Sequence, residues 1–342
     1  MKNEDFAHAV ARVRVLETKL LNENEMERML LAKSPQDAYK IFNELDYSTH
    51  IGDIDDVASF QEVINAGLKS TKELLVKIVP HKWVFDILWL RYDFHNIKTL
   101  LKAKLSGKEY DEIAGYLMPL GAIEIDRLKA FVFDGQDVSF RLKEDHEKAV
   151  VSGIKEAEKL FVKTQDPQMI DLYLDRKFCK ISVDIAKASG HKFIIDFIRK
   201  YIDLKNIEAF IRLKIQGREE SLLEQVLTNS GTLKKYRFTD AFKKDINEFS
   251  ETMKHTDYAD VVREGIRGFM EEKSFAPLEK ATYDHLTNFI QVAKRIAFGP
   301  EPIIGYFWAK KNNALVIRTI MVGKLNGFEP DEIKSKLRTL YI

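Results

Sequence analysis

Apolar residues recur at spacings of three and four along most of the chain, and strict two-residue alternation is scarce. This period places apolar side chains on one face of an α-helix, whereas a half-buried strand requires alternation. The segment from Lys82 to Lys104 contains no glycine or proline, and its Ile97 and Leu101 lie four positions apart. We therefore predict an all-α fold with short loops, in which this segment forms one helix about 35 Å long.

Two dipeptides carry the signals of helix N-termini. Ser34 precedes Pro35, and Asp166 precedes Pro167. Serine and aspartate side chains accept hydrogen bonds from the free N–H groups of a first turn, and proline suits the first helical position because it needs no N–H there. We expect helices to begin at both prolines, and the second helix to run through Tyr173.

The chain contains an internal repeat. Residues 81–107 align without gaps with residues 191–217, and we call the separation of His81 from His191 the repeat interval. Eight of the 27 positions are identical, where composition alone would give about two. These identities are His81/His191, Lys82/Lys192, Asp86/Asp196, Asp93/Asp203, Asn96/Asn206, Ile97/Ile207, Lys104/Lys214 and Gly107/Gly217. A third copy, one further interval along, matches the first at Ile317, Thr319, Lys324, Leu325 and Gly327.

Each copy also keeps the residues that begin and end its long helix, and its apolar stripe. A glycine with positive φ commonly ends a helix, so Gly107, Gly217 and Gly327 predict the three helix ends. The residues that precede the long helices are Pro80, Gly190 and Pro300. The predicted buried stripes are Ile97/Leu101/Leu105, Ile207/Ile211/Ile215 and Ile317/Met321/Leu325.

The repeat predicts three domains of similar size. The repeat interval is too long for a solenoid repeat, which spans about 20–50 residues, and long enough for a small helical domain with its own core. Three like domains could form a pseudo-threefold body or a string, and the repeat leaves both arrangements open. The predicted domains are residues 1–117, 118–228 and 229–342.

Composition excludes several classes of protein. The formal net charge is +1 at pH 7, so the basic excess expected of a nucleic-acid-binding protein is missing. The single cysteine, Cys179, excludes an intramolecular disulfide and a multi-cysteine metal site. The chain has no apolar run long enough to span a bilayer, and its acidic start differs from a secretory signal. We expect a protein of the reducing cytoplasm without a membrane span.

Catalytic motifs are missing from the sequence. It contains no phosphate-binding loop, no dinucleotide-binding glycine pattern and no nucleophile elbow. His146-Glu147 lacks the second histidine of a zinc-protease motif, and His95 beside Asp93 is a weak case for a metal ligand. We therefore expect no catalytic residue, no cofactor and no metal site.

Two other candidates for chemistry have simpler structural interpretations. Cys179 lies between an aromatic and a basic residue, which favours inert packing over a nucleophile. His81, Lys82 and Asp86 recur in the second copy but not in the third, which favours surface residues of a first turn over a repeated site.

Two segments resemble a known family. Residues 91–104 read Arg-Tyr-Asp-Phe-His-Asn-Ile-Lys-Thr-Leu-Leu-Lys-Ala-Lys, and the C-terminal part contains Pro302 to Tyr306, Ile317-Arg318 and the run from Val322 to Gly327. Both segments are similar to the C subunit of archaeal and bacterial V/A-type ATPases, the counterpart of the eukaryotic d subunit. The opening residues 11–15 fit as well, and the resemblance covers essentially the whole chain.

The resemblance implies a structural role. Members of that family are funnel-shaped, all-α bodies of three similar domains around a pseudo-threefold axis. One copy sits on the cytoplasmic face of the membrane rotor ring, built of proteolipid subunits, and joins it to the central shaft of the D and F subunits. Such a protein transmits rotation between ATP chemistry and H⁺ or Na⁺ transport, and it has no active centre.

Six residues are candidates for contacts with those partners, because arginine and tyrosine are enriched at interfaces. A solvated helix face is an equal alternative for each, and for Asn96 an inter-helix hydrogen bond is favoured. The mixed spacing of Lys98, Lys102, Lys104 and Lys108 favours a solvated surface over contact with lipid or an acidic subunit. The six candidates are Arg12, Arg14, Arg91, Tyr92, Asn96 and Arg318.

Two other functions fit the same helical pattern. A three-domain scaffold that binds other proteins would share the repeat and lack ATPase partners. An all-α enzyme with a repeated site would require a deep apolar pocket with convergent polar groups and perturbed pKa values.

Overall fold

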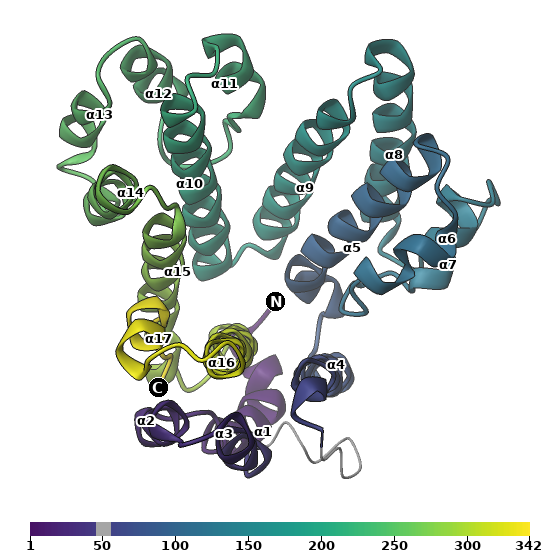
Figure 1. Ribbon diagram of the computed structural model, residues 1–342. Coiled ribbons are helices and arrows are strands. Elements are labelled where there is room, and N and C mark those ends of the chain that lie inside the picture. Colours follow the sequence, from purple (N-terminus) through teal and green to yellow (C-terminus); the bar gives the residue numbers. More distant parts are fainter. Residues whose placement is uncertain (46–55) are drawn as a thin grey trace. The chain divides into compact units, whose positions relative to one another are not determined.

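A computed structural model describes residues 1–45 and 56–342, and this part of the chain is all-α (Figure 1). It holds 17 α-helices, four short 3-10 helices and no strand within those ranges. The prediction of an all-α fold is confirmed. No helix in the described ranges has the length and apolarity that crossing a bilayer would require.

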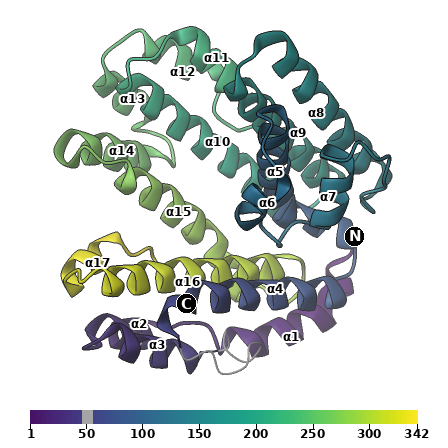
Figure 2. The ribbon, with the colours of Figure 1, turned by 45° about the vertical axis from the view of Figure 1, so that its right-hand side comes forward.

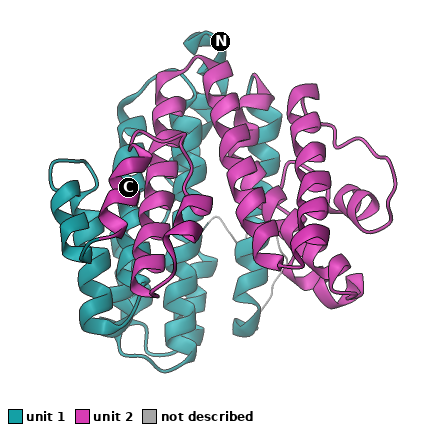
Figure 3. Ribbon diagram, turned by 90° about the horizontal axis from the view of Figure 1, so that it is seen from above, with its two compact units in different colours: residues 1–80, 244–342 teal, residues 81–243 magenta. Residues whose placement is uncertain are grey.

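The chain folds into two compact units (Figure 3). Unit 1 comprises residues 1–80 and 244–342, so it combines the N-terminal and the C-terminal parts of the sequence. Unit 2 comprises residues 81–243. The division into three domains at residues 117 and 228 stays a prediction.

In unit 2, helix α9 lies between α5 and α10 and contacts both, and α8 packs along α9 (Figure 1). The elements of unit 2 are α5 (Lys82–Leu105), α6 (Tyr110–Ile113), η4 (Ala114–Tyr116), α7 (Ile125–Val132), α8 (Glu144–Thr164), α9 (Pro167–Ser189), α10 (Lys192–Ile215), α11 (Glu220–Val226) and α12 (Lys235–Phe242).

In unit 1, helix α16 is central: α1, α4 and α15 all pack against it (Figure 2). Of its 25 residues, 18 are buried, so it is covered on nearly all sides. The elements of unit 1 are η1 (Asn3–Phe6), α1 (Ala7–Glu17), α2 (Glu23–Leu31), α3 (Pro35–Asn43), η3 (Val57–Ser59), α4 (Phe60–Ile78), α13 (Ile246–Met253), α14 (Ala259–Glu272), α15 (Ala276–Ile290), η5 (Gln291–Arg295), α16 (Glu301–Leu325) and α17 (Pro330–Lys336).

Both predicted helix starts are confirmed. The Ser34 hydroxyl accepts a hydrogen bond from the Asp37 N–H at 3.1 Å, and α3 begins at Pro35. The Asp166 carboxylate accepts from the Gln168 N–H at 2.9 Å, and α9 begins at Pro167. These side chains satisfy donors that a first turn leaves without a partner.

The repeat in the sequence is also a repeat of helices. Helices α5 and α10 have 24 residues each, and both their starts and their ends are separated by the repeat interval. Helices α7 and α12 have 8 residues each and the same separation. Helix α16 ends one repeat interval after α10.

The three glycines end the long helices as predicted. Gly107, Gly217 and Gly327 have φ angles of 70°, 63° and 71°. After Gly107, the Lys108 N–H donates to the Ala103 carbonyl at 3.0 Å, and the equivalent bond follows the other two glycines. This is the Schellman arrangement, in which a left-handed residue lets the chain satisfy carbonyls of the last turn.

The buried stripe is shorter than predicted. Ile97 and Leu101 are buried, and so are their counterparts in α10 and α16, but Leu105 is half-buried and Leu325 is 46% exposed. The third position of each stripe falls in the last turn, immediately before the chain turns away at the glycine, so fewer neighbours cover it.

Replacing Gly217 with alanine should destabilise the fold by about 1 kcal/mol, because an L-residue is strained at positive φ. An added Cβ would meet no atom within 4 Å at either Gly217 or Gly115, but only Gly217 has a positive φ. Gly115→Ala is therefore the matched control and should be nearly neutral. Urea unfolding measures both, and equal stabilities would contradict the conformational explanation.

Candidate functional site

In unit 2 a buried carboxylate on α10 holds the backbone that leads into α12. Asp203 is fully buried, and its two carboxylate oxygens accept hydrogen bonds from the N–H groups of Thr232 and Leu233, each at 2.9 Å. One turn further along α10, Asn206 accepts from the Thr228 N–H at 3.0 Å and donates to the Thr228 carbonyl at 2.9 Å. We call this Asp–Asn pair and the backbone groups it binds a clamp.

The same clamp occurs one repeat interval earlier, on α5. The carboxylate of Asp93 accepts from the N–H groups of Ala122 and Ile123, each at 2.9 Å. The amide of Asn96 donates to the Met118 carbonyl at 2.9 Å and accepts from the Met118 N–H at 2.8 Å. Both copies therefore use identical chemistry to fix the segment between a short helix and the next one.

Each clamp requires a glycine beside the carboxylate. A Cβ built on Gly231 would overlap an oxygen of Asp203, and a Cβ built on Gly121 would overlap the same oxygen of Asp93. Gly121 and Gly231 are also separated by the repeat interval, outside the segment in which the repeat is recognisable by identity. Extending the alignment to residues 118–123 and 228–233 is the signal that could have located the clamps.

In the third copy the N-terminal segment takes the clamped position. Asn313 follows Asp203 by one repeat interval, and its amide oxygen accepts from the Leu21 N–H at 2.6 Å while its nitrogen donates to the Ala309 carbonyl. Leu21 immediately precedes Asn22, the N-cap of α2. Ile123 and Leu233 likewise precede the N-caps of α7 and α12, so α2 corresponds to those helices.

Two of the six predicted interface residues have structural partners that account for much of their chemistry. Arg14 on α1 donates to the carbonyls of Ala293 and Ile296, each at 2.7 Å, and pairs with Glu17 at 2.6 Å. Asn96 is fully buried, but its partner is the loop backbone of Met118 and not a second helix, so the expected inter-helix hydrogen bond is corrected. A contact of either residue with another subunit stays a prediction.

The other four candidates lie on both units. On α5, Arg91 is exposed and its guanidinium lies 5.4 Å from the ring centroid of Tyr92, which is 7% exposed. In unit 1, Arg12 is exposed on α1. Arg318 on α16 donates to the side chain of Gln61 on α4 at 2.6 Å. Their interface roles stay predictions as well.

The lysines of α5 do not form a purely solvated surface. Lys98 pairs with Asp175 at 2.8 Å, and Lys102 pairs with Asp171 at 3.0 Å, which ties α5 to α9. Lys104 pairs with a carboxylate of α8 at 3.0 Å. Each exposed pair contributes little alone, about 0–1 kcal/mol, but together they fix α5 against two neighbouring helices.

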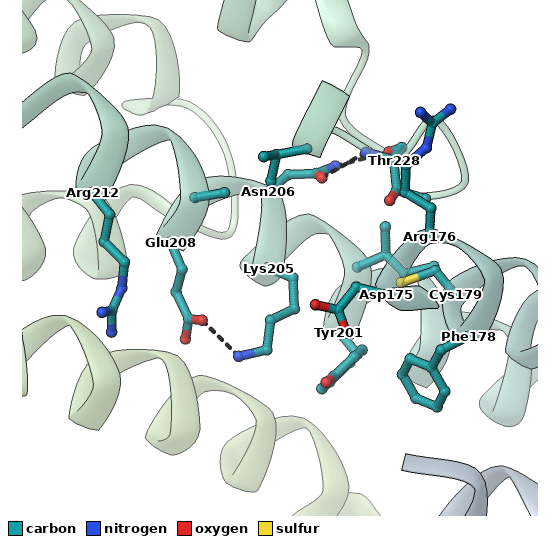
Figure 4. Close-up of a pocket in the computed structure, with 13 residues that line it drawn as sticks. Asp175, Arg176, Phe178, Cys179, Tyr201, Lys205, Asn206, Glu208, Arg212 and Thr228 are labelled. Atoms are coloured by element: carbon teal, nitrogen blue, oxygen red, sulfur yellow. Dashed lines mark hydrogen bonds and ion pairs between the residues drawn. The ribbon is translucent and has the colours of Figure 1, made fainter. Parts of the chain in front are cut away.

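A charged cavity of about 380 Å³ lies between α9, α10 and the end of α11 (Figure 4). Lys205 pairs with Glu208 at 2.6 Å inside it. Burial lowers the pKa of Lys205, but the neighbouring Glu208 more than offsets this, so the pKa is raised overall and the ammonium stays charged. The Asn206–Thr228 clamp forms part of the cavity wall, so one side of the cavity already has a structural role.

Cys179 lines the same cavity (Figure 4) but is a poor nucleophile. Burial, reinforced by the nearby Asp175 carboxylate, raises the pKa of its thiol to about 12. The reactive thiolate is therefore almost absent at neutral pH.

In the described part of the chain, the histidines and acids do not assemble a metal site. Within the described ranges, no three or more His, Cys, Asp or Glu side chains cluster as metal ligands would. His95 contacts the Tyr116 carbonyl at 3.0 Å. Lys192 pairs with Asp196 in the second copy, whereas Asp86 faces His146 at 3.8 Å in the first, so the repeated triplet builds two different arrangements.

Residues 9–336 match the family described as ATP synthase (C/AC39) subunit. The chain is 26% identical over 333 residues to the C subunit of the V-type sodium ATPase of Enterococcus hirae, covering 96% of this chain and 97% of that one. It is 24% identical over 363 residues to the C subunit of the A-type ATP synthase of Methanocaldococcus jannaschii, covering 98% and 86%. For the same protein of Methanothermobacter thermautotrophicus the identity is 24%, covering 97% and 87%.

These full-length matches define the class: a non-catalytic subunit of a rotary ATPase. The chain belongs to the ATP synthase (C/AC39) subunit family, to which the C subunits of V/A-type ATPases belong. The resemblance found in the sequence is confirmed.

The clamp predicts a non-additive pair of substitutions. Asp203→Ala should destabilise the chain by about 1–3 kcal/mol, because it removes the acceptor of the partly buried N–H groups of Thr232 and Leu233. Gly231→Ala should cost a similar amount, because the added methyl overlaps the carboxylate. In the double variant the overlap is gone, so its loss of unfolding free energy should be clearly smaller than the sum. Additive losses in guanidinium unfolding would count against the clamp.

The raised pKa of Cys179 predicts selective protection of the only thiol in the chain. Incubation with iodoacetamide at pH 8 should leave the native chain unmodified, whereas the chain unfolded in guanidinium should gain one adduct, because its thiol regains an ordinary pKa. Mass spectrometry reads the result. Labelling at equal rates in both states would show that the thiol is neither buried nor suppressed.

Proposed function

We propose that this chain is the non-catalytic socket of the central rotor in a V/A-type ATPase. In this role it joins the D and F shaft subunits to the proteolipid ring of the membrane and passes torque between ATP chemistry and H⁺ or Na⁺ transport. The observation that carries the proposal is the family match over residues 9–336, since it extends over nearly the entire chain.

The proposal includes an arrangement of the three copies. Each copy, within residues 1–117, 118–228 and 229–342, supplies one long helix that ends at a glycine, and together the copies form a funnel around a pseudo-threefold axis. Support comes from the common repeat interval and from the clamps at Asp93 and Asp203. A funnel of this kind presents one end to a shaft and the other to a ring.

Torque transmission also requires stiffness, and the local structure supports it. Long helices with close-packed cores resist deformation, because cores have few voids into which side chains can move. In the clamps, backbone N–H groups donate to buried carboxylates, so the segments that lead into α7 and α12 are held in place. The net charge of +1 suits local docking patches better than one global field.

The proposed location is the cytoplasmic side of the membrane, as a peripheral protein present in one copy per complex. Its proposed partners are D, F and the proteolipid ring. The proposal includes no nucleic-acid partner and no span of the bilayer by this chain.

Binding to isolated partners tests the proposal. The tagged full chain should capture a purified D–F shaft and, separately, the detergent-solubilised ring of the same organism, and all three should elute together in size-exclusion chromatography. The peripheral-stalk proteins of the same complex serve as a control and should not be captured. A folded chain that binds neither shaft nor ring would overturn the proposal.

A further inference from the structure

The connection between α15 and α16 differs from its counterparts in the other copies. Residues 79–81 join α4 to α5, and residues 190–191 join α9 to α10. The equivalent connection in the third copy is the segment 291–300, which we call the third-copy loop. An element that occurs once in a triplicated chain can distinguish one copy from the other two.

The base of this loop is held firmly. Arg14 on α1 donates to the Ala293 and Ile296 carbonyls at 2.7 Å each. The Gln291 side chain donates to two carbonyls of the C-terminal segment, those of Leu340 and Tyr341, at 3.2 Å each. Ala293 is fully buried, so the loop is anchored beside its exposed residues.

On this fixed base the loop displays apolar and cationic side chains. Val292 is 48% exposed and Phe298 is 54% exposed. Lys294 and Arg295 between them are exposed too, and the segment 291–300 contains no acidic residue. Large exposed apolar side chains on a backbone that is already ordered indicate an interaction site, because little conformational freedom remains to be lost on binding.

We propose that the third-copy loop docks a protein partner within the rotary complex, and this inference rests on the proposed function. The partner presents an apolar pocket that receives Phe298, with carboxylates at its rim that pair with Lys294 and Arg295. Aromatic and arginine side chains are the residues that most often dominate interface energetics. Because the other two connections lack this loop, docking also selects one of three otherwise similar orientations.

The charge pattern favours a protein over a lipid surface. Segments that bind anionic membranes usually carry clusters of about four to eight Lys or Arg residues. The third-copy loop has two cations and one aromatic residue, which is too few for a lipid anchor but sufficient for the centre of a protein contact.

A triple substitution in the full chain tests the inference: Phe298→Ala with Lys294→Glu and Arg295→Glu. The control is Val162→Ala with Lys159→Glu and Lys163→Glu on α8, where one apolar side chain and two cations are likewise exposed and Val162 is 64% exposed. The loop variant should bind the D–F shaft or the ring about tenfold or more weakly, whereas the control should stay within about twofold. Biolayer interferometry with each purified partner measures both.

The outcomes separate this inference from the proposed function. Unchanged affinity of the folded loop variant for both partners would overturn the docking loop alone, whereas an unmodified chain that binds neither partner would overturn the proposed function as well. If the chain co-sediments with phosphatidylcholine–phosphatidylserine vesicles and the loop variant does not, the loop binds a lipid surface and not a protein. If circular dichroism shows that the triple variant unfolds at a lower temperature, the single variants Phe298→Ala and Arg295→Glu test the inference instead. Phe298→Ala should speed dissociation from the partner, and Arg295→Glu should slow association at low salt.

Discussion

A buried carboxylate on a long helix holds the backbone that follows the next short helix, and the packing of the first two copies depends on this interaction. Moving a carboxylate out of water costs several kcal/mol, so Asp93 and Asp203 are stable in the interior only where donors surround them. Two backbone N–H groups meet each carboxylate, and a glycine leaves room for the approach. The route of the chain from α5 to α7, and from α10 to α12, follows from that requirement.

In unit 1 a side-chain amide at the equivalent position joins the two ends of the sequence. Asn313 stands at the position of the two aspartates, and its acceptor oxygen binds the N–H of Leu21. Helix α2 then follows as α7 and α12 follow their clamps, and Lys324 donates to the Ala32 carbonyl at its end as Lys214 donates to the last carbonyl of α12. The N-terminal segment is therefore built into the third copy, although Lys324 and Ala32 are 292 positions apart in the sequence.

Local features of the fold could be predicted from the sequence, and distant contacts could not. The glycine ends and the caps at Ser34 and Asp166 depend on residues within one or two turns, so periodicity and residue type are sufficient. Arg14 and the α5 lysines resembled surface or interface residues because their partners lie on helices far away in sequence. The clamps are harder to predict: their side chains lie in the recognised repeat, but the backbone groups that they bind lie outside it, where Gly121 and Gly231 are the shared residues. The family resemblance was recognisable because two specific segments carry it.

A triplicated helical chain with one distinctive loop suits the proposed coupling role, in which the chain joins the shaft to the ring and catalyses no reaction. Coupled transport tests this account most directly. In sealed vesicles that contain the rotary complex reconstituted without this chain, ATP should drive no ion uptake, and stoichiometric addition of the chain should restore it. Ion uptake at the full rate in the absence of the chain would contradict the account.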